Sequence, residues 1–344
     1  MAGSPNGYLV FDIESVADID LIAKVRHPQG DVTPEEALRL FQQEQMEKKG
    51  TGFIPFTFQV PISLVIARIN GDFEFTGIKC LRWENGGPKR IAEDFWEYWR
   101  QCGKPTFVTF NGRGFDIPMM EMMAFRYGIP VPEWFGPTGS YSPRSRYNQA
   151  AHFDLFEYLS NFGSAMINGG LNLSAKVLRK PGKIETHGDM VQDMFEQGGS
   201  SDIHAYCFCD VLDTYFIFLR CKVLTGEITP QREAELIQKV RSYITGRADK
   251  SPVHRLYIDA WEKAEAALTV DERFARKLQL ARAAAQPPAE PAESAGPAES
   301  AEPAEPAPEQ EPAAGPAPEA EQAPEQGPEP PETLAGPGAD DPPF

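Results

Sequence analysis

The sequence has few cysteines, and their spacing does not pair them. The five are Cys80, Cys102, Cys207, Cys209 and Cys221, and none of them stands in a CxxC arrangement. An odd number without the spacing of metal ligands argues against both a disulfide framework and a structural zinc site. We therefore expect a reduced, intracellular protein.

Long apolar runs and a secretory leader are also lacking. No stretch reaches the roughly 18 apolar residues that a membrane-spanning helix needs. The opening residues MAGSPNG contain neither the basic region nor the apolar region of a signal peptide. These absences predict a cytoplasmic protein that does not contact a membrane.

Basic residues are missing from the C-terminal part of the chain. Residues 283 to 344 contain no Lys or Arg and almost no large apolar residue, but they hold 17 of the 32 prolines and 14 of the 50 acidic residues. Such a composition buries too little surface to offset the entropy of ordering, so we expect a disordered acidic tail that solvates, tethers or docks a protein partner of unknown identity. The net charge of −17 therefore comes mostly from the tail, because the other 36 acids nearly balance the 33 basic residues.

The remainder of the chain alternates strand-like and helix-like segments. Five segments have the apolar, β-rich composition of strands: residues 8–15, 62–69, 73–81, 106–110 and 152–155. The pair Asn70-Gly71 between the second and third segments is typical of a β-hairpin. We predict an α/β fold in which an antiparallel meander of three strands leads into parallel βα units, with helices against a mixed sheet.

Helix start signals mark three further elements. A residue that can cap a helix precedes a proline at Thr33-Pro34, Thr229-Pro230 and Ser251-Pro252. Proline suits the first helical position because the amide that it lacks has no partner within the helix. The first pair predicts a helix inserted after the first strand, and the other two predict helices beyond residue 225.

The first chemical motif lies in the first strand, YLVFDIES. Asp12 and Glu14 are two residues apart, so in a strand they share one face at a separation of roughly 6.6 Å. Two carboxylates this close beside a core repel each other unless a compensating charge is present. No counter-charge is visible in the neighbouring sequence.

A second motif, NGRGFD, follows the strand 106–110 directly. Asp116 stands where catalytic and ligand-binding groups of α/β sheets gather, beyond a strand end and at the start of the next helix. Taken alone, Asp116 is also a reasonable helix cap. A phosphate-binding P-loop is excluded because no GK[ST] follows the glycines.

A third motif, YCFCD, lies within a long helical segment. Tyr206 and Asp210 are four residues apart and therefore share one helix face. Apolar residues surround them, so Asp210 is not expected on a solvated stripe. In isolation this pattern also fits an Asp that merely forms a hydrogen bond with a nearby Tyr. Asp213 has no Tyr four residues before it and is not part of the motif.

In this order, the three motifs resemble those of the DEDDy group of 3′–5′ exonucleases in the ribonuclease H-like superfamily. The likeness is to the proofreading exonuclease domain of family-B DNA polymerases and its stand-alone bacterial relatives. FDIES matches the first motif, with Ser15 where many relatives have Thr, and NGRGFD and YCFCD match the second and third. The resemblance covers roughly residues 7 to 225 and implies a ribonuclease H-like fold.

The resemblance also implies a chemistry. Hydrolysis of a phosphodiester by two divalent metal ions needs several clustered carboxylates, and Mg²⁺ or Mn²⁺ prefers such oxygen ligands. By family likeness Asp12 bridges both metals, and Glu14 and Asp210 ligate the ion that activates water. Asp116 supports the other ion mainly through its waters. Tyr206 orients the attacking water.

Several other residues are possible substrate contacts. Asn111 and Phe115 match family positions that contact the terminal nucleotide, although Phe115 equally suits core packing. The stretch LRKPGK places Arg179, Lys180 and Lys183 between the second and third motifs, where they suit either phosphate contact or simple solvation.

One further acid, Asp154, has two interpretations. It could support the metal site from a second layer, or it could cap the next helix with Glu157 completing a capping box. We favour the cap.

We therefore expect a metal-dependent 3′–5′ exonuclease that acts on single-stranded 3′ ends and releases nucleoside 5′-monophosphates. DNA is favoured over RNA, and the alternatives are an exoribonuclease or an inactive nucleic-acid-binding protein on the same fold. No polymerase domain is present, so the expected role is proofreading in trans, DNA repair or nucleotide turnover. The expected organisation is an exonuclease domain at residues 7–225, added helices at 226–282 and the tail at 283–344.

Overall fold

The computed structural model describes residues 6–139, 141–184, 190–267 and 269–285. Most of the predicted tail, from residue 286 onward, lies outside these residues. The described chain up to residue 267 forms one compact unit, and helix α12 (Val270–Ala285) belongs to a second unit that is treated by itself.

The first unit is built on a five-stranded mixed sheet. Its strands are β1 (Tyr8–Ala17), β2 (Gln59–Ile69), β3 (Phe75–Arg82), β4 (Thr106–Thr109) and β5 (His152–Asp154). Their spatial order is β3-β2-β1-β4-β5, with β1–β2 and β2–β3 antiparallel and β1–β4 and β4–β5 parallel. The predicted meander, its hairpin and the following parallel units are confirmed, and β1 is the central strand.

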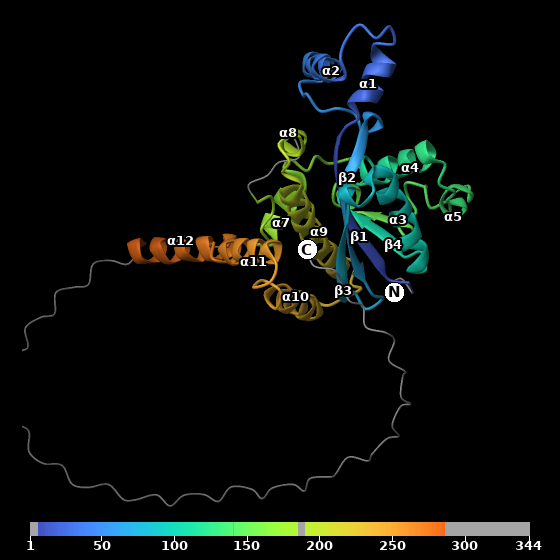
Figure 1. The fold of residues 1–344 in the computed structure, drawn as a ribbon. Coiled ribbons are helices and arrows are strands. Elements are labelled where there is room, and N and C mark those ends of the chain that lie inside the picture. The colour runs from blue at the N-terminus through green and yellow to red at the C-terminus, as the bar shows by residue number, and fades with distance from the viewer. Residues whose placement is uncertain (1–5, 140, 185–189, 268, 286–344) are drawn as a thin grey trace, which may run out of the picture. The chain divides into compact units, whose positions relative to one another are not determined.

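Helices cover both faces of this sheet and extend beyond it (Figure 1). In chain order the helices of the first unit are α1 (Ile19–Arg26), α2 (Pro34–Lys49), α3 (Gly87–Gln101), α4 (Asp116–Tyr127), α5 (Pro132–Phe135), α6 (Leu155–Leu159), α7 (Gly170–Val177), α8 (Val191–Glu196), α9 (Ser200–Leu224), α10 (Pro230–Thr245) and α11 (Pro252–Glu265). Two short 3₁₀ turns, η1 (Phe56–Phe58) and η2 (Trp83–Asn85), flank β2 and β3.

Alternation along β1 divides the core into two layers. Leu9, Phe11 and Ile13 pack with α3 and α4 on one face of the sheet. Tyr8 and Val10 pack with α9 on the other face. Because side chains alternate along a strand, Asp12 and Glu14 continue the row that faces α9. Figure 1 shows α9 on the opposite side of the sheet from α3 and α4.

Helices α1 and α2 form an insertion between β1 and β2. They share a small core of their own, whose buried members are Ile22, Ala37, Leu38, Phe41 and Ile54. The predicted cap of α2 is confirmed, since the Thr33 hydroxyl accepts a hydrogen bond from the Glu36 amide at 3.2 Å. Gly50 ends α2 in a left-handed conformation, with φ of 71°, and turns the chain back toward β1.

Helices α10 and α11 pack on α9. Thr229 caps α10 as predicted, because its hydroxyl accepts from the Arg232 amide at 3.1 Å. Ser251 precedes α11 at the capping position as predicted, but its hydroxyl is hydrogen-bonded to His254 Nδ1 at 2.8 Å and not to the helix backbone. No helix in the described part of the chain is both long and apolar enough to cross a membrane.

Candidate active site

The first motif lies on the central strand and faces the longest helix. Glu14 is buried with 8% of its surface exposed, and Asp12 is half-buried. The pairing between β1 and β2 shifts register immediately after Glu14, because Glu14 lies opposite Ser63 while Ser15 lies opposite Pro61. Asp12 and Glu14 therefore lie at the end of the regularly paired part of β1, directly before this register shift.

The third motif lies on α9, opposite the first. Tyr206 and Asp210 share the helix face that points at β1, and the two side chains are close enough for the Asp210 charge to raise the pKa of the Tyr206 hydroxyl. Between them, Cys207 Sγ donates to the Asp12 carbonyl oxygen at 3.3 Å and ties the helix to the strand. As a result, one carboxylate oxygen from each of Asp12, Glu14 and Asp210 lies within 4.8 Å of the other two.

The second motif brings Asp116 to the same place from the other side of the sheet. Asp116 is the first residue of α4 and is 3% exposed, and the capping position belongs to Phe115, which makes no side-chain cap. The alternative interpretation of Asp116 as a helix cap is therefore wrong. Asp116, Asp12 and Glu14 line one cleft of about 580 Å³.

Crowding in this cleft shifts the acids toward their protonated forms. Burial, reinforced by the neighbouring carboxylates, raises the pKa values of Asp12 and Glu14 well above their usual range. Burial also raises the pKa of Asp116 to about 7 and that of Asp210 to about 6. Lys183 is the nearby cation, and its charge lowers the pKa values of Glu14 and Asp210 against this trend.

The arrangement fits divalent metal ions. Within the described structure, Oδ1 of Asp116 and Oδ1 of Asp210 are buried and have no hydrogen-bond donor. A buried acceptor without a partner is costly and unusual, and it points to a water or an ion as the missing partner. Hard divalent cations have the positive charge that these four acids lack, and they prefer carboxylate oxygens as ligands.

Comparison with known proteins agrees with this geometry. Residues 51–261 match the model of a family described as predicted 3′–5′ exonucleases related to the exonuclease domain of PolB. The chain belongs to this exonuclease family. A search of curated proteins found no significant match.

The matched span holds the second and third motifs of this exonuclease but begins after the first. Asp12 and Glu14 precede it, as do α1 and α2. The sheet nevertheless pairs β1 with β2 and β4, which both lie inside the matched span. Because of this pairing, the first motif lies at the centre of the exonuclease domain, although it precedes the matched span.

Asp154 holds the loop that carries the second motif. Its carboxylate accepts from the amides of Phe156 and Glu157 at 3.0 and 3.2 Å, as expected of a cap for α6. It also accepts from the amides of Asn111 and Arg113 at 3.0 and 2.8 Å. The favoured cap interpretation is confirmed, and the second pair of bonds gives Asp154 an additional role in positioning this loop.

The same loop requires glycine at one position. A Cβ at residue 112 would lie 2.4 Å from the Thr109 hydroxyl, far inside contact distance. The Gly112 amide instead donates to this hydroxyl at 3.2 Å. Asn111 takes a left-handed φ of 66°, which Asn tolerates better than most residues. The tight turn places Asp116 at the floor of the cleft.

We expect Asp154→Ala to lower exonuclease activity by roughly ten- to a hundredfold, because supporting contacts to metal ligands have effects of that size. The substitution removes the acceptor for four amides and so releases the second-motif loop. Nucleotide release from a labelled oligomer and the Tm measure the effect. Thr229→Ala is the matched control, since it removes a remote helix cap at a cost of about 1 kcal/mol and should leave activity unchanged. Equal activity losses in both variants would contradict this role of Asp154.

The predicted basic loop divides into three different environments. Lys183 lines the cleft, and its ammonium lies 5.5 Å from the centre of the Tyr206 ring. Arg179 is half-buried and donates to the Ala267 carbonyl oxygen at 3.2 Å. Lys180 is only 5% exposed, and its ammonium lies 4.0 Å from the centre of the Trp261 ring. The expected solvent-exposed phosphate contact at Lys180 is therefore wrong, because this side chain belongs to the core.

A buried polar cluster continues from Lys180 into α9 and α11. Asp213, the residue excluded from the third motif, is fully buried and accepts from the Tyr257 hydroxyl at 2.6 Å. Burial raises the pKa of Asp213 to about 8 and lowers that of Lys180 to about 8. This cluster joins α9 to α11, and it lies close enough to Asp210 for that carboxylate to contribute to the raised pKa of Asp213.

Asn111 and Phe115 both line the cleft, where a terminal nucleotide would lie. Two further lining residues, Phe53 and Gln59, follow the α1–α2 insertion and were not anticipated. Their sequence neighbourhood carries no motif, so only the fold reveals them. The rings of Phe53 and Phe115 meet at a centroid distance of 5.9 Å.

One serine–histidine–glutamate arrangement also escaped sequence-based detection. His204 Nδ1 lies 2.9 Å from Ser63 Oγ, and its Nε2 lies 3.1 Å from a carboxylate oxygen of Glu84. Ser63 is fully buried in the middle of β2, with 0% of its surface exposed. A hydroxyl without access to solvent offers no nucleophile, so this group ties α9 to β2.

Proposed function

We propose that this exonuclease hydrolyses phosphodiester bonds at the 3′ end of single-stranded DNA and releases nucleoside 5′-monophosphates. The observation that carries the proposal is the meeting of Asp12, Glu14 and Asp210 within 4.8 Å, with Asp116 in the same cleft. The family's described relation to the exonuclease domain of PolB supports DNA over RNA. Residues 7–225 form the proposed catalytic domain, extended by the helices that follow.

Two divalent metal ions, Mg²⁺ or Mn²⁺, would supply an activated water and stabilise the leaving oxygen. Asp12 would bridge the two ions, and Glu14 and Asp210 would hold one of them. Asp116 would support the other. The unpartnered oxygens of Asp116 and Asp210 are consistent with these roles.

Tyr206 would orient the attacking water through its hydroxyl. Burial and the adjacent carboxylates raise the pKa of Tyr206, so the hydroxyl keeps its proton at neutral pH. It therefore acts as a hydrogen-bond donor and not as a base. Asp210 lies one helical turn further along the same face of α9, beside this hydroxyl.

Three residues around the acids would hold the terminal nucleotide. Lys183 provides a positive charge beside Glu14 and Asp210, where the scissile phosphate must approach. Phe115 offers a ring face for the base, and Asn111 offers an amide. Arg179 and Lys180 are left out of this set, because one binds a backbone carbonyl and the other is buried.

The decisive experiment compares substrates of one sequence. Single-stranded DNA, duplex DNA and single-stranded RNA, each labelled at the 3′ or the 5′ end, are incubated with the full-length protein in Mg²⁺ or Mn²⁺. The expected result is release of mononucleotide from the 3′ end, fastest for single-stranded DNA. Faster cleavage of RNA would reassign the substrate. Binding of oligomers without cleavage in any metal would overturn the proposed activity.

A further inference from the structure

A second pocket adjoins the acidic cleft and shares a wall with it. Its volume is about 440 Å³, within the range of about 300–1,000 Å³ that is usual for small-molecule sites. Three residues, Ser15, Phe53 and Gln59, line both spaces. Ser15 directly follows Glu14 on β1, so the pocket opens one residue beyond the carboxylates. We call it the amide pocket, because Gln42, Gln59 and Gln192 line it.

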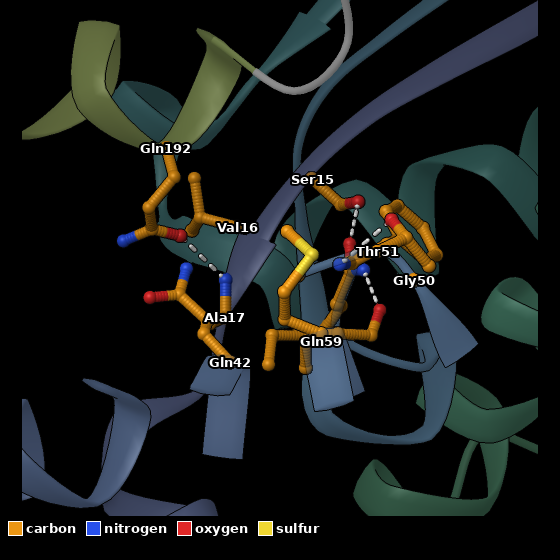
Figure 2. Close-up of a pocket in the computed structure, with 12 residues that line it drawn as sticks. Ser15, Val16, Ala17, Gln42, Gly50, Thr51, Gln59 and Gln192 are labelled. Atoms are coloured by element: carbon orange, nitrogen blue, oxygen red, sulfur yellow. Dashed lines mark hydrogen bonds between the residues drawn. The ribbon is translucent and has the colours of Figure 1, made fainter. Parts of the chain in front are cut away.

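Uncharged polar side chains and apolar side chains together line the amide pocket (Figure 2). Among the described residues that line it, none is acidic or basic. A phosphate would find no counter-charge there, and a purely apolar ligand would cover the Gln42 amide without giving it a hydrogen-bond partner. A flat group with several hydrogen-bonding atoms, such as a nucleobase, suits this lining best.

Two of the three glutamines are held in place by protein groups. Gln59 is hydrogen-bonded to the Ser15 hydroxyl and donates to the Ile54 carbonyl oxygen. Gln192 accepts from the Ala17 amide at 2.9 Å and donates to Glu196 at 2.7 Å. Figure 2 shows the dashed bonds from Ser15 to Gln59 and from Ala17 to Gln192.

Gln42 is different, because its amide has no hydrogen-bond partner among the described residues. It projects from α2 into the pocket (Figure 2). An amide offers both a donor and an acceptor in one plane, which matches the edge of a base. Gln42 is therefore the polar group that is available to a ligand.

Phe53 supplies an aromatic face at the boundary between the two spaces. Its side chain lines both the amide pocket and the acidic cleft, and 52% of its surface is exposed. The Thr51 hydroxyl accepts from the Phe53 amide at 3.3 Å and restrains this turn. An exposed ring next to a nucleotide site is a stacking platform.

We propose that the amide pocket binds the base of the penultimate nucleotide, with Phe53 as the stacking surface and Gln42 as the hydrogen-bonding partner. This inference rests on the proposed function, which places the terminal nucleotide against Phe115 in the acidic cleft. The next base along the strand then reaches the adjoining space across Phe53. The insertion that carries α1 and α2 thereby forms part of the substrate-binding site.

The test measures binding separately from hydrolysis. The full-length Asp12→Asn protein is titrated in Mg²⁺ into a 5′-fluorescein-labelled single-stranded DNA hexamer, and fluorescence anisotropy gives the Kd. A second hexamer lacks the penultimate base but keeps its sugar and phosphate, and a third lacks the base nearest the 5′ end. We expect a Kd about tenfold higher for the second hexamer, as the loss of one stacked base predicts. The third hexamer should bind like the intact one.

Variants identify the residues that recognise the missing base. In the Asp12→Asn background, Phe53→Ala and Gln42→Ala should weaken binding of the intact hexamer and reduce the effect of removing the penultimate base. Phe53→Leu should behave like Phe53→Ala, and Phe53→Tyr should retain the wild-type response, which separates stacking from apolar packing. Gln43→Ala and Phe125→Ala are matched controls, because both side chains are exposed and lie outside the two spaces.

The outcomes distinguish this inference from the proposed function. Equal Kd values for the intact and penultimate-abasic hexamers would overturn the proposed role of the amide pocket, even if the wild-type protein hydrolyses DNA. A clear loss of affinity for the abasic hexamer without hydrolysis by the wild-type protein would support the pocket and refute the exonuclease. A failure to bind any hexamer would overturn both.

Discussion

Asp12→Asn is expected to abolish nucleotide release, with a fall of at least about a thousandfold, because that factor corresponds to about 4 kcal/mol of transition-state stabilisation and metal ions supply several kcal/mol. The pKa of Asp12 is raised by the charges of all three other acids, Asp116, Glu14 and Asp210. Asp210→Asn should have a similar effect. Release of mononucleotide from a 3′-labelled oligomer measures both, and undiminished activity in either variant would refute the metal mechanism.

The same substitution should stabilise the protein when metal is absent. A carboxyl group whose pKa is raised by folding contributes stability below its unfolded pKa of about 4, and this contribution is lost as pH rises through the folded pKa. Burial raises the pKa of Asp12 in this way, so between its unfolded pKa and pH 8 the metal-free wild type loses stability that Asp12→Asn, which cannot ionise, retains. The expected gain is a few degrees in Tm, at about 2–4 °C for each kcal/mol.

An exposed acid provides the control for this stability effect. Asp72 lies in the turn between β2 and β3, where its side chain is exposed. Asp72→Asn removes the same charge from the protein without relieving the crowded cleft, so its metal-free Tm at pH 8 should match that of the wild type. A lower Tm for Asp12→Asn than for Asp72→Asn would contradict the charge crowding described above.

Removal of divalent metal ions is the second change that we expect to have a large effect on hydrolysis. We expect a chelator to eliminate hydrolysis and Mg²⁺ or Mn²⁺ to restore it, because in the proposed mechanism the ions supply the activated water and stabilise the leaving oxygen. Metal should also raise the Tm, since a ligand at a hundred times its Kd stabilises the folded state by about 2.7 kcal/mol. Asp12→Asn and Asp210→Asn should show a much smaller rise.

The metal effect should depend on pH in a defined direction. Protons and metal ions compete for the same carboxylates, and burial raises the pKa of Asp116 to about 7 and that of Asp210 to about 6. Metal affinity should therefore increase between pH 6 and pH 8 as these acids lose their protons. A titration of Mg²⁺ against Tm at both pH values measures this change. Hydrolysis that persists in excess chelator, or a metal-induced rise in Tm that does not depend on pH, would contradict the prediction.

The parts of the site that could be predicted from the sequence are those encoded over short distances. Strand alternation places Asp12 and Glu14 on one face, and helical spacing places Tyr206 and Asp210 on one face, whatever the rest of the chain does. The antiparallel meander and the parallel units that follow it were predicted from a hairpin signal and from βα alternation. These features depend on the chain's immediate neighbours and therefore survive folding unchanged.

The parts that could not be predicted depend on contacts between distant segments. Asp154 was recognisable as a cap, but its bonds to the second-motif loop require the pairing of β4 with β5. Lys180 stands in a hydrophilic stretch, and only the packing of α11 covers it with Trp261. Phe53 and Gln42 carry no motif, because they gain their position from the separate core of the α1–α2 insertion.

The buried cluster beneath α11 bears on the smallest part of this chain that can fold alone. Lys180 and Asp213 belong to the segment before residue 225, yet the groups that cover them, Trp261 and Tyr257, come from α11. A fragment that ends at residue 225 would expose the apolar side of α9. It would also leave the Asp213 carboxyl group and the Lys180 ammonium group without the side chains that cover them. The part of the chain that can fold alone therefore includes α11. The family match, which ends at residue 261, also ends within this helix.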